Sequence, residues 1–225
     1  MPRKKTQSGI DRLTEIAARL RAPDGCPWDR EQDHMTLREH AIEEVYELID
    51  AIEAGDEPEM IEELGDMLFQ VVFHCQLGHE RGAFDFDQIA HRISDKLVNR
   101  HPHVFGDTKV NTVADVLTNW EAIKRAEKVG TQHERPSALD GIPKHLPALQ
   151  RAEKLVKKAR KAKLLDGKVS TKRAPSKKEL AEHLFSLAAY AQQQGWSAET
   201  LLREEVKRKE KTLRKLELKA VKKTS

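Results

Sequence analysis

Two groups of carboxylates lie close together in the first half of the sequence. Glu43, Glu44 and Glu47 form an EExxE pattern, and Glu63 and Asp66 form an ExxD pattern shortly after it. A helix turns by about 100° per residue, so residues three apart project from one face. If the two helices pack antiparallel, both faces point to one place, and carboxylate oxygens suit Mg²⁺ or Mn²⁺. The spacing therefore predicts a divalent-metal site.

The same carboxylates also fit a solvated helix face. They lie opposite the apolar stripe of their own segment, which we expect to face the core: Ile42, Val45, Ile49 and Ile52. However, residues 39–80 contain thirteen Asp and Glu and no Lys or Arg, whereas solvated helices usually interleave opposite charges. This imbalance favours a bound cation, with the basic end of the chain as the competing source of positive charge.

Helical periodicity extends along nearly the whole sequence, and no segment alternates as a strand does. We expect an all-α fold, with helices over about residues 8–20, 36–54, 58–77 and 86–100 and a fifth from residue 111 or 112. Gly55 should end the second helix, and Asp115 should help to cap the fifth. The third helix should place one apolar stripe in register: Ile61, Leu64, Leu68, Val71 and Cys75.

The charge of the chain changes sign along its length. Residues 1–136 carry 17 Lys+Arg and 27 Asp+Glu, whereas residues 137–225 carry 23 and 10. We therefore place the main domain boundary between Glu134 and Ser137. The basic region fits a solvated helical surface, a contact with nucleic acid, or a counter-charge for the acidic region of this or a neighbouring chain.

The basic region should also be helical, with one break. We expect a Lys-rich helix, a polar linker from Asp166 to Pro175, a helix capped by Ser176 with Glu179, and a last helix after Gly195.

The overall composition fits a protein with a core and a heavily charged surface. Charged residues make up 34% of the 225 residues and the hydrophobic set 38%. No apolar run approaches the roughly 20 residues that span a bilayer, and the first residues lack the apolar core of a secretory signal. We expect a cytoplasmic protein with no membrane partner, in which Cys26 and Cys75 are free thiols.

Five motifs occur in an order that resembles the MazG nucleoside triphosphate pyrophosphohydrolases. The resemblance covers roughly residues 9–150, and its motifs are Gly25–Asp29 with Gln32, the EExxE and ExxD patterns, residues 65–73, and Arg100–Phe105. It implies a helical bundle of the all-α NTP pyrophosphatase type that forms a homodimer or a higher homo-oligomer. It also implies hydrolysis of ribo- or deoxyribonucleoside triphosphates to a monophosphate and pyrophosphate, as nucleotide-pool house-cleaning.

The resemblance also implies roles for individual residues. The metal, Mg²⁺ or alternatively Mn²⁺, would be held by Glu44, Glu47, Glu63 and Asp66, with Glu43 beside them as a base that orients water. The residues implied to contact the nucleotide are Trp28, Lys96, Arg100, Trp120 and Lys124. From the residues alone, Lys96 with Arg100 also fits a solvated pair, Trp120 a core side chain, and Trp28 a buried loop anchor.

The sequence departs from the family pattern in two places. Asp33 follows Gln32 where a threonine is usual, and Glu39–His40 replaces a common Pro-Tyr, which leaves recognition of the base open. Residues 151–225 look like the second half of another MazG unit that has lost its EExxE half, so we interpret them as a non-catalytic remnant. The alternative function is a helical interaction protein whose acidic helices dock a basic partner.

Overall fold

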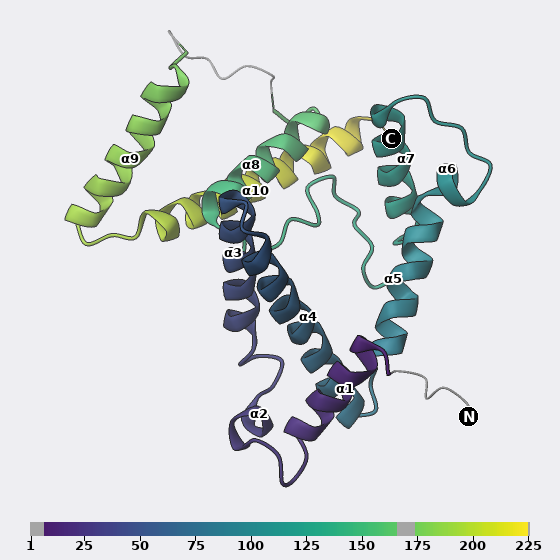
Figure 1. The fold of residues 1–225 in the computed structure, drawn as a ribbon. Coiled ribbons are helices and arrows are strands. Elements are labelled where there is room, and N and C mark those ends of the chain that lie inside the picture. The colour runs from purple at the N-terminus through teal and green to yellow at the C-terminus, as the bar shows by residue number, and fades with distance from the viewer. Residues whose placement is uncertain (1–6, 166–173, 225) are drawn as a thin grey trace, which may run out of the picture. The chain divides into compact units, whose positions relative to one another are not determined.

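The computed structural model describes residues 7–165 and 174–224, with side chains described to residue 220. Within these ranges the chain forms ten helices and no strand (Figure 1), which confirms the expected all-α class. In chain order the helices are α1 (Gly9–Leu20), α2 (Pro27–Glu31), α3 (Arg38–Ala54), α4 (Glu57–Glu80), α5 (Phe86–Arg100), α6 (Pro102–Phe105), α7 (Val113–Ala126), α8 (Ala148–Lys161), α9 (Lys177–Gln193) and α10 (Ala198–Thr224).

The chain divides into two compact units, Met1–Val116 and Leu117–Ser225. The division falls inside α7. The boundary predicted at residues 134–137 rests on a change of composition and stays a prediction.

The first unit is built on the hairpin of α3 and α4, which pack against each other along their length (Figure 1). Gly55 ends α3 with φ at 69°, a left-handed conformation that glycine adopts at little cost, and Asp56 caps α4 by accepting a hydrogen bond from the Glu59 N–H. A connection this short forces the helices to run antiparallel. Helices α1 and α5 also pack on α4.

The buried face of α3 is not the one that the sequence predicted. The expected inward stripe of Ile42, Val45, Ile49 and Ile52 is at least 40% exposed at every position. The buried residues are Leu37 and Ala51, and Glu44 lies on their face because it is seven residues, or about two turns, from each. The expected orientation of α3 was therefore wrong, and Glu44 faces inward.

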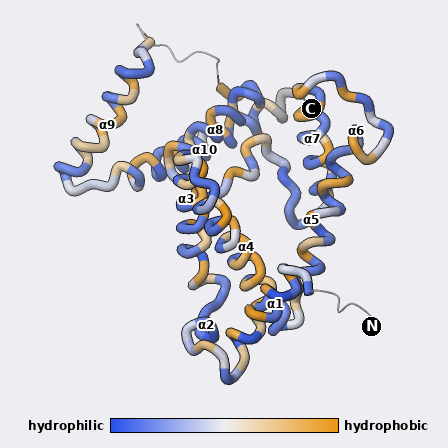
Figure 2. Tube along the Cα trace, in the orientation of Figure 1, coloured by the Kyte–Doolittle hydropathy of each residue, from blue (hydrophilic) through white to orange (hydrophobic). Residues whose placement is uncertain are grey.

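Helix α4 shows the same rotation over its first half. Ile61, Leu64, Leu68 and Val71 of the predicted stripe are exposed, and Figure 2 shows hydrophobic positions along the whole helix. Burial occurs further along, at Val72, Phe73 and Leu77, and at Cys75 as expected. Within one chain, the hairpin buries Leu37, Phe73 and Leu77 in one cluster and leaves both predicted stripes largely uncovered.

Several predicted helix boundaries are confirmed by their caps. Thr112 and Asp115 exchange hydrogen bonds at the start of α7, and Ser176 with Glu179 forms a capping box at the start of α9. Gly195 has φ at 72° before α10. The short helices α2 and α6 were not among the expected helices. Most of the predicted linker, residues 166–173, lies outside the described residues.

The second unit has a core of its own between α8 and α10. This core is formed by Leu139, Leu155, Ala159, Val206 and Leu213. The segment before α8 is tied to α10, since the Glu217 carboxylate accepts hydrogen bonds from the Ser137 hydroxyl and the Ala138 N–H. None of the described helices is both long and apolar enough to cross a membrane.

Candidate active site

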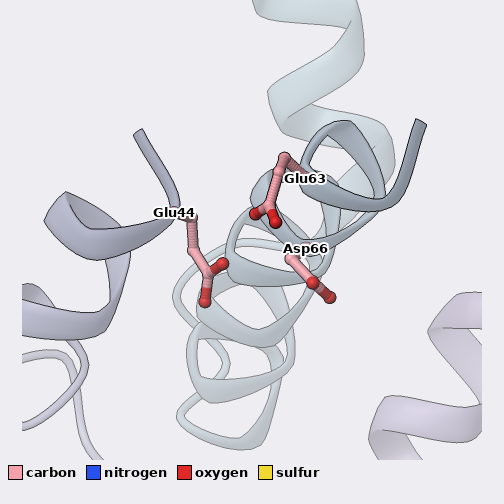
Figure 3. Close-up of side chains that lie close together, drawn as sticks. All are labelled: Glu44, Glu63 and Asp66. Carbon is pink, nitrogen blue, oxygen red and sulfur yellow. The ribbon is translucent and has the colours of Figure 1, made fainter. Parts of the chain in front are cut away.

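Three carboxylates from the α3–α4 hairpin converge. Glu44 of α3 and Glu63 and Asp66 of α4 each offer one oxygen atom, and these atoms lie within 4.8 Å of one another. Figure 3 shows Glu44 reaching from one helix toward the other two side chains on its neighbour. We call Glu44, Glu63 and Asp66 the acidic triplet.

The triplet is partly withdrawn from water. Glu63 is only 7% exposed, and its Oε2 atom is buried without a hydrogen-bond partner in the described structure. Glu44 is half-buried and accepts one hydrogen bond from the Gln70 amide, with Nε2 and Oε1 3.5 Å apart. Among the described residues, the triplet forms no ion pair with Lys or Arg. A buried carboxylate oxygen with no donor is costly unless a cation binds it.

Electrostatics in the triplet point the same way. Burial raises the pKa of Glu44, and the nearby charge of Asp66 raises it further. Burial also raises the pKa of Glu63, followed by the charge of Glu47. Crowded like charges in a partly dry site favour a divalent cation.

The donor set fits Mg²⁺ or Mn²⁺. All three groups are hard oxygen ligands, and the unpartnered Glu63 oxygen is free to coordinate. Glu44, Glu63 and Asp66 would hold the ion.

The other two predicted acidic residues lie at the edge of the triplet. Glu47 is exposed and outside the 4.8 Å group, yet its charge acts on Glu63. Glu43 is exposed, and its Oε2 lies 3.7 Å from the His40 Nδ1 atom.

The part of the chain that carries the triplet matches a known family. Residues 32–105 match the family model of the MazG nucleotide pyrophosphohydrolase domain. We call residues 32–105 the MazG domain, after the family model that they match.

The sequence similarity to known proteins extends over more residues than this MazG domain. The chain is 51% identical over 150 residues to a nucleoside triphosphate pyrophosphohydrolase of Escherichia coli, covering 66% of this chain and 56% of that protein. It is 53% identical over 142 residues to an uncharacterized protein, YabN, of Bacillus subtilis, covering 63% of this chain and 28% of that protein. It is 41% identical over 155 residues to a nucleoside triphosphate pyrophosphohydrolase/pyrophosphatase MazG of Thermotoga maritima, covering 68% of this chain and 58% of that protein.

The alignments thus cover little more than half of these relatives, or less. A crystal structure of a mazG-related protein from Thermotoga maritima aligns with 51% of this chain and 97% of its own, with 25% identity and a TM-score of 0.44.

Of the predicted nucleotide contacts, two lie inside the MazG domain. Lys96 and Arg100 are one turn apart on α5, but Lys96 is exposed whereas Arg100 is only 8% exposed. Trp28 lies just before the domain, on α2, and is 53% exposed with its ring edge against His40 at a centroid distance of 5.9 Å. Trp120 and Lys124 are half-buried on the part of α7 that belongs to the second unit.

The structure adds contacts that the sequence did not predict, one of them at the triplet. Gln70 lies one turn after Asp66 on the same face of α4, so helical spacing could have predicted its contact with Glu44. The side chain of Arg21 meets Glu80, which is 59 residues away in the sequence, and no local pattern signals such a pair.

Proposed function

We propose that this chain hydrolyses nucleoside triphosphates, ribo- or deoxyribo-, to a monophosphate and pyrophosphate, with Mg²⁺ or Mn²⁺ held by Glu44, Glu63 and Asp66 and supported by Glu47. The observation that carries the proposal is the acidic triplet inside the MazG domain, with its buried and unpartnered Glu63 oxygen. The names of the Escherichia coli and Thermotoga maritima relatives support the same reaction.

The reaction requires neutralisation of a strongly anionic substrate. When bound, the divalent ion neutralises phosphate charge and polarises the bond to be broken. The triplet fixes the ion on the hairpin. In this proposal Glu43, which is exposed and next to Glu44 in the sequence, accepts a proton from water as the water oxygen bonds to phosphorus and the anhydride bond between the α- and β-phosphates breaks.

The remaining contacts follow from exposure and charge. Lys96 is the exposed cation of the Lys96–Arg100 pair on α5 and would contact phosphate oxygens. Arg100, the last residue of α5, is buried one turn further along. The half-exposed indole of Trp28 offers a stacking surface for a base. Trp120 and Lys124 are proposed to complete the contacts from α7.

The uncovered apolar faces of α3 and α4 support a homo-oligomer. Eight large apolar side chains on one hairpin are each at least 40% exposed, which is typical of an interface and not of a surface left to water. We propose that a second copy covers them in a homodimer, or in a higher homo-oligomer.

Residues 137–225 are proposed to be the remnant of a second MazG unit, without a catalytic role. Residues 1–136 would then form the catalytic region, acting in house-cleaning of the cytoplasmic nucleotide pool. The alternative proposal for the basic region, residues 137–225, is contact with nucleic acid.

A helical interaction protein is the second candidate function. The exposed apolar stripe would serve it equally well, but docking a basic partner gives no reason for carboxylates to converge on the inner face of the hairpin.

The test uses the purified full chain with a panel of nucleoside triphosphates and Mg²⁺, and it measures pyrophosphate and phosphate separately. We expect pyrophosphate and monophosphate as the first products, no turnover in excess chelator, and poor support by Ca²⁺. Phosphate as the sole first product would refute the reaction assigned here. Absence of any metal-dependent hydrolysis would favour the interaction protein.

A further inference from the structure

The guanidinium of Arg21 joins three elements of the first unit. Its Nε and Nη2 atoms donate to the two carboxylate oxygens of Glu80 at 2.7 and 2.8 Å. Its Nη1 donates to the backbone carbonyls of Asp29 and of Gln32, the latter at 3.1 Å. Arg21 follows the last residue of α1, Glu80 is the last residue of α4, and the two carbonyls belong to the end of α2.

The arginine in these contacts is largely shielded from water, whereas the Glu80 side chain is 33% exposed. The Arg21 side chain is 11% exposed, and its guanidinium carbon lies 5.6 Å from the centre of the Phe73 ring. The hydrogen bond from Arg21 is the main reason why the pKa of Glu80 is lowered. A bidentate, charge-assisted pair of this kind has a defined direction as well as strength.

Helix α2 is too short to be stable by itself, so contacts from other segments must fix its position. It has five residues, and its N-cap residue, Cys26, provides no side-chain cap. Helices this short are unstable alone, and their last carbonyls need donors from elsewhere. Arg21 donates to two carbonyls at this end of the helix, that of Asp29 within α2 and that of the C-cap residue Gln32.

The segment held in this way carries Trp28. Asp29, directly after Trp28, is buried, while the indole is half-exposed and has its edge against His40. His40 is one helical turn before Glu44 on α3. The pose of the indole relative to the acidic triplet therefore depends on the carbonyls that Arg21 holds.

We propose that Arg21, anchored by Glu80, is a positioning residue for the nucleobase: it fixes α2 so that Trp28 presents its ring to the base of the substrate. This inference rests on the proposed function, since it needs a nucleotide in the site. Arg21 touches neither the triplet nor, in this role, the phosphates. It acts on binding of the base and leaves the chemical step alone.

The test compares Arg21→Gln, Arg21→Lys and Glu80→Gln with the full-length parent. The matched control is Arg19→Gln, because Arg19 is an exposed arginine of the same helix end whose guanidinium pairs with Asp24 in the loop. The substrate is whichever canonical triphosphate the parent hydrolyses best. Inorganic tripolyphosphate, which has no base, serves as competitive inhibitor.

We expect Arg21→Gln to raise KM about tenfold with kcat within about twofold of the parent. The dissociation constant for Mn²⁺ alone and the inhibition constant of tripolyphosphate should not change. Arg21→Lys should recover little, since an ammonium cannot reach the carboxylate and both carbonyls, and Glu80→Gln should fall between. In a Trp28→Ala background, Arg21→Gln should add almost nothing, because both changes remove the same interaction.

An equal rise in the inhibition constant of tripolyphosphate, a fall in kcat with unchanged KM, or additivity with Trp28→Ala would each overturn the proposal. If Arg21→Gln fails to fold, the Arg21→Lys and Glu80→Gln arms decide in the same way. If the parent itself hydrolyses no triphosphate, the proposed function fails separately. Quenching of tryptophan fluorescence by a nucleoside monophosphate, lost in Trp28→Ala and weakened in Arg21→Lys, then still tests the positioning role.

Discussion

His34 and His74 are hydrogen-bonded through their Nδ1 atoms, 2.8 Å apart, with their rings stacked at a centroid distance of 5.0 Å. The Arg81 Nη2 atom lies 2.7 Å from the other ring nitrogen of His34. Arginine can only donate, so His34 accepts at Nε2 and must donate from Nδ1 to His74. This chain of hydrogen bonds joins the loop before α3 to α4, and it requires both rings to be neutral.

Acidification should therefore destabilise the first unit. Burial lowers the pKa of His74, and the electrostatic interaction with the neighbouring His34, which would repel a second proton, lowers it further. Because the folded-state pKa lies below the unfolded value of about 6.5, the stability from neutral His74 is complete above that pH and is lost as the pH falls toward the folded pKa. Urea unfolding at a series of pH values should show a decrease that His74→Gln reduces and that His79→Gln, an exposed histidine on the same helix, retains. An unchanged pH profile in His74→Gln would count against the pair.

Neutralising the acidic triplet should separate activity from stability. Glu44→Gln or Asp66→Asn should lower metal-dependent hydrolysis by about a hundredfold or more, because each removes a carboxylate ligand of the cation that must neutralise the triphosphate charge. Without metal, their melting temperatures should equal or exceed that of the parent, since repulsion between carboxylates is relieved. Glu62→Gln, an exposed change beside Glu63, is the control. Parental activity in both triplet variants would return these residues to a structural role.

Metal affinity should fall on acidification before ordinary carboxylates titrate. The raised pKa values of Glu44 and Glu63 mean that protons compete with the ion above the usual value of 4.5. In the metal-free protein the same shifts favour folding at low pH, and this contribution is lost as the pH rises through the folded pKa values. Calorimetric Mn²⁺ titrations at about pH 7 and about pH 5 should show weaker binding at the lower pH. Equal Mn²⁺ affinities at the two pH values would contradict the raised pKa values of Glu44 and Glu63.

The place where the chain is shortened should decide whether the remainder folds. A chain ending at residue 165 keeps Leu139, Leu155 and Ala159 but loses the α10 residues that cover them, so we expect it to aggregate. A chain ending at residue 136 removes that core completely and should remain helical and retain hydrolysis. Circular dichroism, light scattering and pyrophosphate release compare the two. Loss of turnover in a folded chain ending at residue 136 would place part of the active site in the second region.

A charge on the uncovered stripe should prevent assembly. Ile49→Lys puts an ammonium on the apolar face of α3, while Asp50→Lys puts the same side chain on an exposed polar position about 100° around that helix. Sedimentation should find the parent and Asp50→Lys associated and Ile49→Lys monomeric. A monomeric parent would leave the stripe without the partner proposed for it.

Local chemistry in the sequence predicted much of the fold. The glycine at residue 55 and the Ser176–Glu179 box marked helix boundaries correctly, because caps depend on a few adjacent residues. The convergence of Glu44 with Glu63 and Asp66 followed from spacing and a short turn.

Long-range packing could not be obtained in the same way. The strongest apolar stripe on α3 predicts a face that is buried in the core, but the stripe is exposed within the chain. Helix periodicity indicates which face should be buried and not whether the same chain or another molecule buries it. Arg21 and Glu80 are polar residues whose pairing depends on how α1 and α4 meet, so their sequence positions carry no sign of it.

The acidic triplet lies on one continuous stretch of chain, with a two-residue connection at Gly55 and Asp56 between its halves. In evolutionary terms, the proposed metal site is a single segment that can be copied, shortened elsewhere or joined to a new neighbour without being rebuilt. Its vulnerable point is length. One residue inserted after Glu44 within α3 would turn that carboxylate by about 100° relative to the connection, away from Glu63 and Asp66, even if every ligand were retained.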